Sequence, residues 1–142
     1  MIVRVQRDPF DPWQELAAAG KRLAAAGAHG ATAVFVGSLR DYNQGQPVSA
    51  MTLEHYPGMT EAHLEKVGRE AAARWPILDA LVVHRYGALT PGEPIVLVAV
   101  WSAHRDAAFA ACRYIIDELK TRAPFWKRER TAAGARWATP ED

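Results

Sequence analysis

The sequence is short of cysteine, of net charge and of long apolar runs, and each shortage excludes a class of protein. Cys112 is the single cysteine in 142 residues, so neither an internal disulfide nor a cysteine-based zinc cluster is available. A formal net charge of +1 does not favour a general polyanion binder. No apolar run approaches the roughly 20 residues that span a bilayer. The N-terminal MIVRVQRDPF lacks the apolar centre of a signal peptide, so we expect a cytoplasmic protein.

Motifs of several common functional sites are missing as well. The sequence contains no HExxH, GxGxxG, P-loop or GxSxG pattern, so metal, nucleotide and serine-hydrolase interpretations have no support. His55 and His63 show no ligand spacing with each other or with a carboxylate cluster. We therefore expect no metal and no cofactor.

What the sequence does contain is the composition of one globular domain over residues 1–142, with 49% hydrophobic and 23% charged residues. Hydrophobic patterning shows no repeats and alternates between strand and helix periods. Strands are predicted at 2–6, 30–39, 48–56, 79–89 and 93–103, and helices at 13–27, 58–75 and 104–122. Residues 125–138 are predicted to be an extended segment with a turn near Gly134. This order predicts a mixed α/β (α+β) fold with three helices, in which consecutive strands pair antiparallel.

The helices also have predicted faces and caps. Trp13, Leu16 and Leu23 share one side of the first helix. Thr60 and Ser102 are the candidate N-caps of the second and third helices.

The predicted third helix carries the most chemistry. Lys120 lies about 40° from Ile116, at the edge of the apolar stripe, where a lysine can serve as an acid, a base or a nucleophile. The alternative is a cation that only complements the helix dipole near the C-terminus. The stripe itself recurs at spacings of three, four and three and comprises Phe109, Cys112, Ile116 and Leu119.

His104 and Arg105 stand at the other end of this helix, where first-turn amides and an arginine form a candidate anion site. The alternative is a solvent-facing histidine and an arginine paired with Asp106. Arg105 falls on the core-facing side, so we expect it to be partly covered. At 1.5 Å per residue, Arg105 and Lys120 are roughly 22 Å apart, so one small ligand cannot touch both. If both serve one site, they come from different copies of the chain.

The positive charge of the chain is concentrated near its C-terminal end. Residues 113–136 carry a local balance of +4, whereas the remainder sums to −3. In that region LKTRAPFWKRE, residues 119–129, places Lys120 and Lys127 on either side of Pro124. A local basic patch on an otherwise acidic chain favours a specific anion over a nucleic-acid surface.

Two arginines elsewhere are further candidates. Arg40 follows a buried strand and precedes the polar turn 40–47, where a loop can present it to a ligand. Arg85 neighbours His84 in a strand, so one of the two faces solvent or an interface, and a structural role is favoured for Arg85.

Five segments resemble, in order and spacing, the large catalytic subunit of molybdopterin synthase. The resemblance covers roughly residues 30 to 137, and its AHR, LK and P-[F/I]-WK-[R/K]-E series is highly specific. The segments are FVGSLRDYNQG, LEHYPGMTE, HRYGALTPGE, SAHRDAAFAACRYIIDELK and RAPFWKRE.

This resemblance implies an α/β-hammerhead fold and a sulfurtransferase of molybdenum cofactor biosynthesis. Members of the family convert cyclic pyranopterin monophosphate, a pterin phosphate, into the dithiolene molybdopterin. Sulfur arrives as a thiocarboxylate on the C-terminal Gly-Gly of a small ubiquitin-like subunit. The family forms a heterotetramer around a homodimer of large subunits, whose pockets combine residues of both copies. No membrane or nucleic-acid partner is implied.

The resemblance also assigns roles to residues. It implies Lys120 and Lys127 as catalytic, substrate-contacting lysines, and Arg40, His104 and Arg105 as the substrate-binding basic residues. Pocket-lining or flanking positions are implied for Phe35, Ile116, Arg128 and Glu129.

Two other functions remain open from the residues. A non-catalytic module could bind the tail of a ubiquitin-like protein in the same basic and aromatic cleft, and a sulfur-transfer assay would distinguish it. A single-strand RNA binder could use Phe125, Trp126 and the arginines, and salt-dependent oligonucleotide binding would reveal it.

Overall fold

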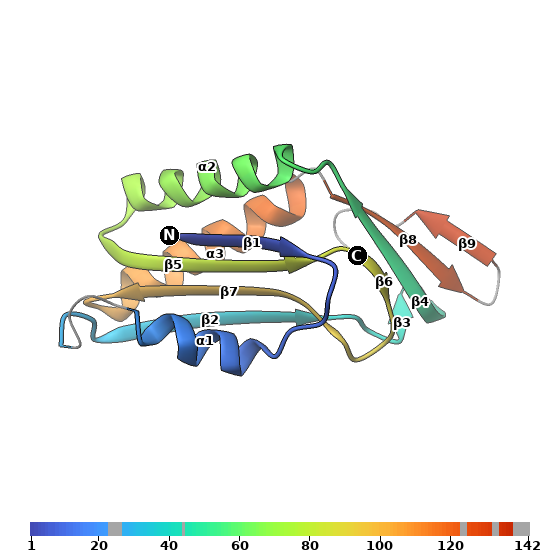
Figure 1. Ribbon diagram of the computed structural model, residues 1–142, viewed down its shortest axis with the longest axis horizontal. Coiled ribbons are helices and arrows are strands. Elements are labelled where there is room, and N and C mark those ends of the chain that lie inside the picture. Colours follow the sequence, from blue (N-terminus) through green and yellow to red (C-terminus); the bar gives the residue numbers. More distant parts are fainter. Residues whose placement is uncertain (23–26, 44, 123–124, 132–133, 138–142) are drawn as a thin grey trace.

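The structure is a computed structural model that describes residues 1–22, 27–43, 45–122, 125–131 and 134–137. Figure 1 shows a long sheet with helices on both faces and a second sheet at one end. The elements follow in the order β1 (Ile2–Gln6), α1 (Pro12–Gly20), β2 (Ala31–Ser38), β3 (Tyr42–Asn43), β4 (Gln46–His55), α2 (Met59–Arg74), β5 (Ile77–Arg85), β6 (Gly87–Leu89), β7 (Pro94–Ser102), α3 (Arg105–Thr121), β8 (Phe125–Thr131) and β9 (Gly134–Trp137).

The first sheet has the strand order β1-β5-β7-β2, and it is buried on both faces. β1 runs parallel to β5, whereas β5 and β2 both pair antiparallel with β7. Alternating residues of β5 serve opposite faces: Ala80 and Val82 pack with α2 and α3, and Leu81 and Val83 pack with α1 (Figure 1). This two-sided burial explains the nearly continuous apolar runs of the central strands.

The second sheet has the order β3-β4-β8-β9, and β6 pairs with β4. Its small core is closed by Phe125 and Ile95 and comprises Leu39, Val48, Met51, Leu53 and Leu89. β8 starts beside the C-terminal end of α3 (Figure 1), so the second sheet lies where the last helix ends.

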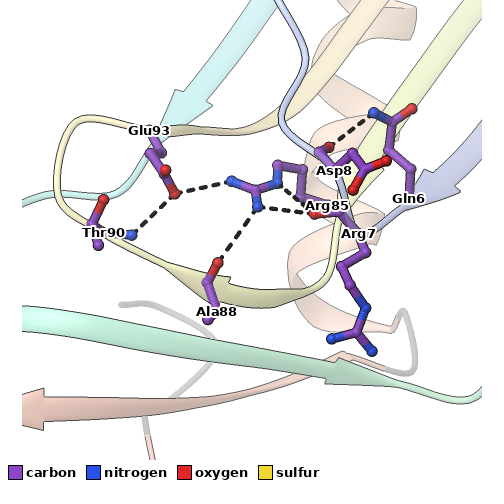
Figure 2. Close-up of polar contacts among 7 residues, drawn as sticks. All are labelled: Gln6, Arg7, Asp8, Arg85, Ala88, Thr90 and Glu93. Carbon is purple, nitrogen blue, oxygen red and sulfur yellow. Dashed lines mark hydrogen bonds and ion pairs between the residues drawn. The ribbon is translucent and has the colours of Figure 1, made fainter.

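Arg85 holds the joint between the two sheets (Figure 2). Its guanidinium donates from Nε and Nη2 to the carbonyl oxygen of Arg7 at 3.1 and 2.9 Å, and from Nη2 to that of Ala88 at 3.4 Å. It also pairs with Glu93, Nη1 to Oε2 at 2.9 Å, and that carboxylate accepts from the amide of Thr90. A buried arginine with these partners ties the β1–α1 loop and the β6–β7 turn to the end of β5.

The mixed α/β class is confirmed, and so is the antiparallel pairing of the predicted strands 79–89 and 93–103. The predicted strands 30–39 and 48–56 do not pair with each other, because β2 pairs with β7 in the first sheet and β4 with β8 in the second. The predicted single strand 79–89 is wrong, because Gly87 has a φ of 90° and the chain turns there from the first sheet into the second. The predicted turn 40–47 contains the short strand β3. The predicted turn near Gly134 is confirmed, because β8 and β9 pair antiparallel with Thr131 opposite Gly134, and residue 138 lies outside the described residues.

Several helix details differ from the predictions. The first helix ends at Gly20, Trp13 is 62% exposed, and Leu23 lies outside the described residues. Thr60 is not a cap, because α2 begins after Gly58, and its buried hydroxyl donates to the carbonyl oxygen of Tyr56 at 2.8 Å.

The third helix differs in its cap and its buried face. His104 is the N-cap residue, and the Ser102 hydroxyl donates instead to the carbonyl oxygen of Pro76 at 3.1 Å. Phe109 is 67% exposed, so its place in the core stripe is wrong. The buried face is centred on small alanines that allow close packing on the sheet, and it comprises Ala107, Ala108, Ala111, Cys112, Ile115, Ile116 and Leu119.

Candidate functional site: a lysine pair at the joint of the sheets

Lys120 and Lys127 come from different elements and approach the same imidazole. Lys120 lies in the last turn of α3 and is exposed, and Lys127 lies on β8, opposite Leu53 of β4, and is half-buried. The positive charges of Lys127 and Lys120 both act on the ring of His84, near the end of β5. Since α3 ends beside the start of β8 (Figure 1), the elements that carry the two predicted lysines meet at the same end of the first sheet.

Several aromatic rings pack together around His84. The rings of His84 and Phe125 are stacked, with centroids 3.9 Å apart and planes inclined by 18°. His55 lies 6.0 Å from the same phenyl ring and 4.3 Å from the ring of Tyr86. Burial, together with the neighbouring positive charges of Lys127 and Lys120, lowers the pKa of His84 to about 4. The hydrogen bond to the backbone of Arg85 acts in the opposite direction and raises this pKa. A neutral imidazole thus lies beside two ammonium groups.

Arg40 belongs to a polar chain on the second sheet. Its Nη2 donates to Oδ1 of Asn43 at 3.4 Å, and Nδ2 of Asn43 donates to Oε1 of Glu129 at 2.8 Å. Glu129 is only 4% exposed, whereas Arg40 is exposed. A buried carboxylate and a fixed amide thus orient an arginine whose other donors face solvent.

His104 and Arg105 are not brought to the lysines. They stand at the N-terminal end of α3, the lysine pair stands at its C-terminal end, and both side chains are exposed. The predicted partial covering of Arg105 is wrong, because the buried face of α3 is centred away from it. The imidazole of His104 makes no capping hydrogen bond. The length of α3 therefore separates the two cationic groups within one chain.

The remaining predicted residues have mixed surroundings. Phe35 is half-buried on β2, opposite Val98, and packs against the core under α3. Ile116 is 6% exposed and belongs to that same core. Arg128 is exposed on β8, opposite Thr52. Phe35 and Ile116 therefore belong to the hydrophobic core between α3 and the first sheet, whereas the side chain of Arg128 is exposed.

The sequence interpretation missed His84 and His55. One of His84 and Arg85 was expected to face solvent or an interface, but both are buried within the chain, at 8% and 5% exposed. Both are buried because β5 ends at the joint. There Phe125 covers the imidazole, and the guanidinium donates to the Glu93 carboxylate and to the carbonyl oxygens of Arg7 and Ala88. The signal in the sequence was the glycine two residues after Arg85, which marks a corner where both faces of a strand can be covered.

Metal ligands and membrane spans can be assessed only for the described ranges. Within them, no group of three or more His, Cys, Asp or Glu residues could hold a metal ion. None of the described helices is long and apolar enough to cross a membrane.

The structure defines the class of protein as a mixed α/β fold of two sheets, with the two predicted lysines on α3 and β8. The particular family follows from comparison with known sequences, since the family model of the MoaE protein matches residues 5–122. The chain belongs to the MoaE family.

Individual relatives agree with this assignment. The molybdopterin synthase catalytic subunit of Pseudomonas aeruginosa is 55% identical over 137 residues, which cover 96% of this chain and 89% of that protein. The crystal structure of molybdopterin synthase from Staphylococcus aureus superposes with a TM-score of 0.83 at 30% identity, covering 94% of each chain. The family membership confirms the predicted activity class, a sulfurtransferase of molybdopterin biosynthesis.

A more distant structure has the same fold. The complex of subunits 1 and 2 of the molybdopterin-converting factor of Helicobacter pylori matches at a TM-score of 0.77 and 22% identity. The match covers 97% of this chain and 90% of that one, and at this identity it shows the fold alone.

Proposed function

We propose that this chain is the subunit that transfers sulfur from the thiocarboxylate of a small ubiquitin-like partner to cyclic pyranopterin monophosphate, forming the dithiolene of molybdopterin. Lys120 and Lys127 are the catalytic residues of this proposal. Arg40, His104 and Arg105 bind the phosphate and the pterin.

The observation that carries the proposal is that α3, with Lys120 in its last turn, ends beside the start of β8, which carries Lys127, where the buried ring of His84 stacks on Phe125 (Figure 1). Lys120 belongs to a helix and Lys127 to a strand of the second sheet. The imidazole of His84 near them is uncharged, so it adds no third positive charge to those of the two lysines. Such a pair suits a reaction in which a thiocarboxylate attacks a pterin carbon and oxyanionic charge develops, because a nearby ammonium stabilises that charge.

The two lysines differ in exposure, and this difference supports different roles. Lys120 is exposed at the end of α3, and it is the residue for proton transfer, or for a transient covalent bond, during loss of water and opening of the cyclic phosphate. Lys127 is half-buried in β8, and it stabilises charge and orients the incoming thiocarboxylate.

Arg105 requires a second copy of the chain to share a site with Lys120. Arg105 and Lys120 lie at opposite ends of a 17-residue helix, and at 1.5 Å per residue they are roughly 22 Å apart. A homodimer that places the N-terminal end of one α3 against the lysine pair of the other would complete the pocket. Arginine then contributes bidentate contacts to the phosphate oxygens.

The small partner and the cellular location are parts of the same proposal. The Helicobacter pylori structure is a complex of two subunits, and a corresponding small subunit here would supply the sulfur. Two copies of each chain would form a heterotetramer around the homodimer. Synthesis of a soluble cofactor precursor fits a cytoplasmic location.

The test is replacement of Lys120 by alanine in the complex with a thiocarboxylated small partner. We expect product formation from cyclic pyranopterin monophosphate to fall by about three orders of magnitude, because a proton-transfer group and its charge are lost together. Lys66→Ala, an exposed lysine on α2, is the matched control and should retain activity. Size-exclusion chromatography should show unchanged assembly for both variants. Near-normal turnover by Lys120→Ala would disprove the assignment.

A further inference from the structure

The rings of His84 and Phe125 connect the two sheets near the end of α3 and the start of β8, the elements that carry the two lysines. His84 lies next to the last residue of β5, in the first sheet, and Phe125 is the first residue of β8, in the second sheet. Their rings are stacked at 3.9 Å, and His84 is 8% exposed. Since β8 is not a strand of the first sheet, this stack is a side-chain connection between the start of β8 and the end of β5.

The orientation of the imidazole is fixed by one hydrogen bond. Nδ1 of His84 lies 2.8 Å from the carbonyl oxygen of Arg85. A carbonyl oxygen only accepts, so Nδ1 carries the proton and donates it. Burial keeps the ring neutral, and Nδ1–H is therefore its single ring donor. Arg85 is itself held by hydrogen bonds to Arg7, Ala88 and Glu93 (Figure 2). The imidazole is therefore anchored to a residue that connects several segments of the joint.

The stack determines where β8 begins and therefore where Lys127 leaves the sheet. Phe125 and Lys127 are two residues apart on one strand, so their side chains project from the same face. The backbone of β8 is in register with β4, with Phe125 opposite His55 and Lys127 opposite Leu53. A shift of the phenyl ring would move the first residues of β8, and Lys127 with them, relative to the end of α3.

We propose that His84 is a positioning residue of the lysine pair: by stacking on Phe125 it holds the start of β8 against β5 and keeps Lys127 beside Lys120. This inference rests on the proposed function only for its effect on turnover. The geometric part concerns the two lysines alone.

The test uses three substitutions in the complex with the small partner. His84→Leu removes the flat ring, and His84→Phe restores a ring that can stack without the Nδ1 donor. Val83→Ala is the matched control, because it opens a cavity on the opposite face of the same strand, next to α1. Circular dichroism and thermal unfolding establish that each variant is folded at the assay temperature.

The first measurement does not depend on turnover. Difluorodinitrobenzene, a short reagent that joins two amines, should link Lys120 to Lys127, and peptide mass spectrometry measures the yield relative to single labelling of Lys66. We expect His84→Leu to lower this yield at least about threefold, because misplacement by about 1 Å is enough to disturb a paired geometry. His84→Phe and Val83→Ala should keep the yield of the unchanged protein.

The second measurement is the rate of dithiolene formation. We expect His84→Leu to lower kcat by roughly tenfold or more while KM for the pterin changes less than about twofold, because a displaced lysine affects the reaction more than binding. His84→Phe should recover most of the rate. In a Lys127→Ala background, His84→Leu should add little further loss, because it acts through that lysine.

The outcomes separate the two proposals. Unchanged cross-linking in His84→Leu, an equal loss in Val83→Ala, or no recovery in His84→Phe would each overturn the positioning role. If the unchanged protein forms no dithiolene but the cross-linking yields follow the predicted series, the proposed function fails and the positioning role stands.

Discussion

The two ends of α3 are built differently. At the C-terminal end, α3 lies beside the start of β8 (Figure 1), and the charge of Lys120 acts on His84, whose buried ring stacks on Phe125. At the N-terminal end, His104 and Arg105 are exposed, and the histidine side chain caps nothing. Both ends carry exposed cations, but only the C-terminal end lies near a buried aromatic stack of its own chain.

This difference indicates which half of the site one chain can supply. The lysine half depends on the joint between the sheets, so it forms as the chain folds. The arginine half gains its surroundings only when another surface covers it, and under the proposed function that surface is the lysine half of a second copy. A site divided in this way would be active only in the assembled dimer.

Mixing two inactive variants should give the largest effect that bears on this comparison. Lys120→Ala and Arg105→Ala should each lower activity by a hundredfold or more, because each removes a charge that acts on the substrate. When the two are unfolded together and refolded at equal amounts, about a quarter of the activity should return, because half of the dimers are mixed and each mixed dimer has one intact site. Steady-state dithiolene formation measures the recovery.

The control is each variant refolded alone, which should remain inactive. Failure of the mixture to recover activity, with mixed dimers confirmed by native mass spectrometry, would contradict a site shared between copies. Lys120 and Arg105 would then act separately, each within its own chain.

Acid should weaken the lysine end before the rest of the fold. The folded-state pKa of His84 is about 4, below its ordinary value of 6.5, so the unfolded chain binds the proton first as the pH falls. Stability is therefore unaffected by this group above pH 6.5 and is lost between pH 6.5 and 4, by roughly 2 to 3 kcal/mol at pH 4.5. Urea unfolding from pH 7 to pH 4.5 measures the loss.

His84→Phe removes the titrating group and keeps a ring for the stack, so its loss of stability over the same range should be smaller by about that amount. His63→Phe, a half-buried histidine on α2, provides the matched comparison. Equal pH dependence of the unchanged protein and His84→Phe would show that this imidazole does not titrate as a buried, neutral group.

Much of the fold could be predicted from local pattern, and the failures have a common cause. Apolar runs predict the central strands, and helical spacing predicts α2 and α3. These elements are predictable because each contributes apolar residues to the core along most of its length. Gly87 marks a corner locally, but the short strands β6 and β3 could not be predicted, because they depend on pairing with β4 in a second sheet. Phe109 was misplaced because spacing favours large residues and ignores Ala108 and Ala111, which bring α3 close to the sheet.

The candidate site divides in a similar way. Lys120 and Lys127 were identified from their charge, their spacing around Pro124 and a specific resemblance, and these signals lie in one short segment. His84 was missed because its partner, Phe125, lies 41 residues further along the chain and in another sheet. No local pattern reports such a contact, so the positioning of a site requires tertiary structure.

The smallest predicted effect concerns the apolar residues at the two ends of α3. Phe109 is 67% exposed near the N-terminal end, so Phe109→Ala should change the free energy of unfolding by no more than about 0.5 kcal/mol. Leu119 is 6% exposed beside the lysine end, and Leu119→Ala should cost about 2 to 5 kcal/mol because it leaves a cavity between α3 and the first sheet. Urea unfolding of both variants at low protein concentration, where association contributes least, measures the difference. A large loss for Phe109→Ala under these conditions would mean that the N-terminal end is already packed within one chain, and the contrast between the two ends would no longer hold.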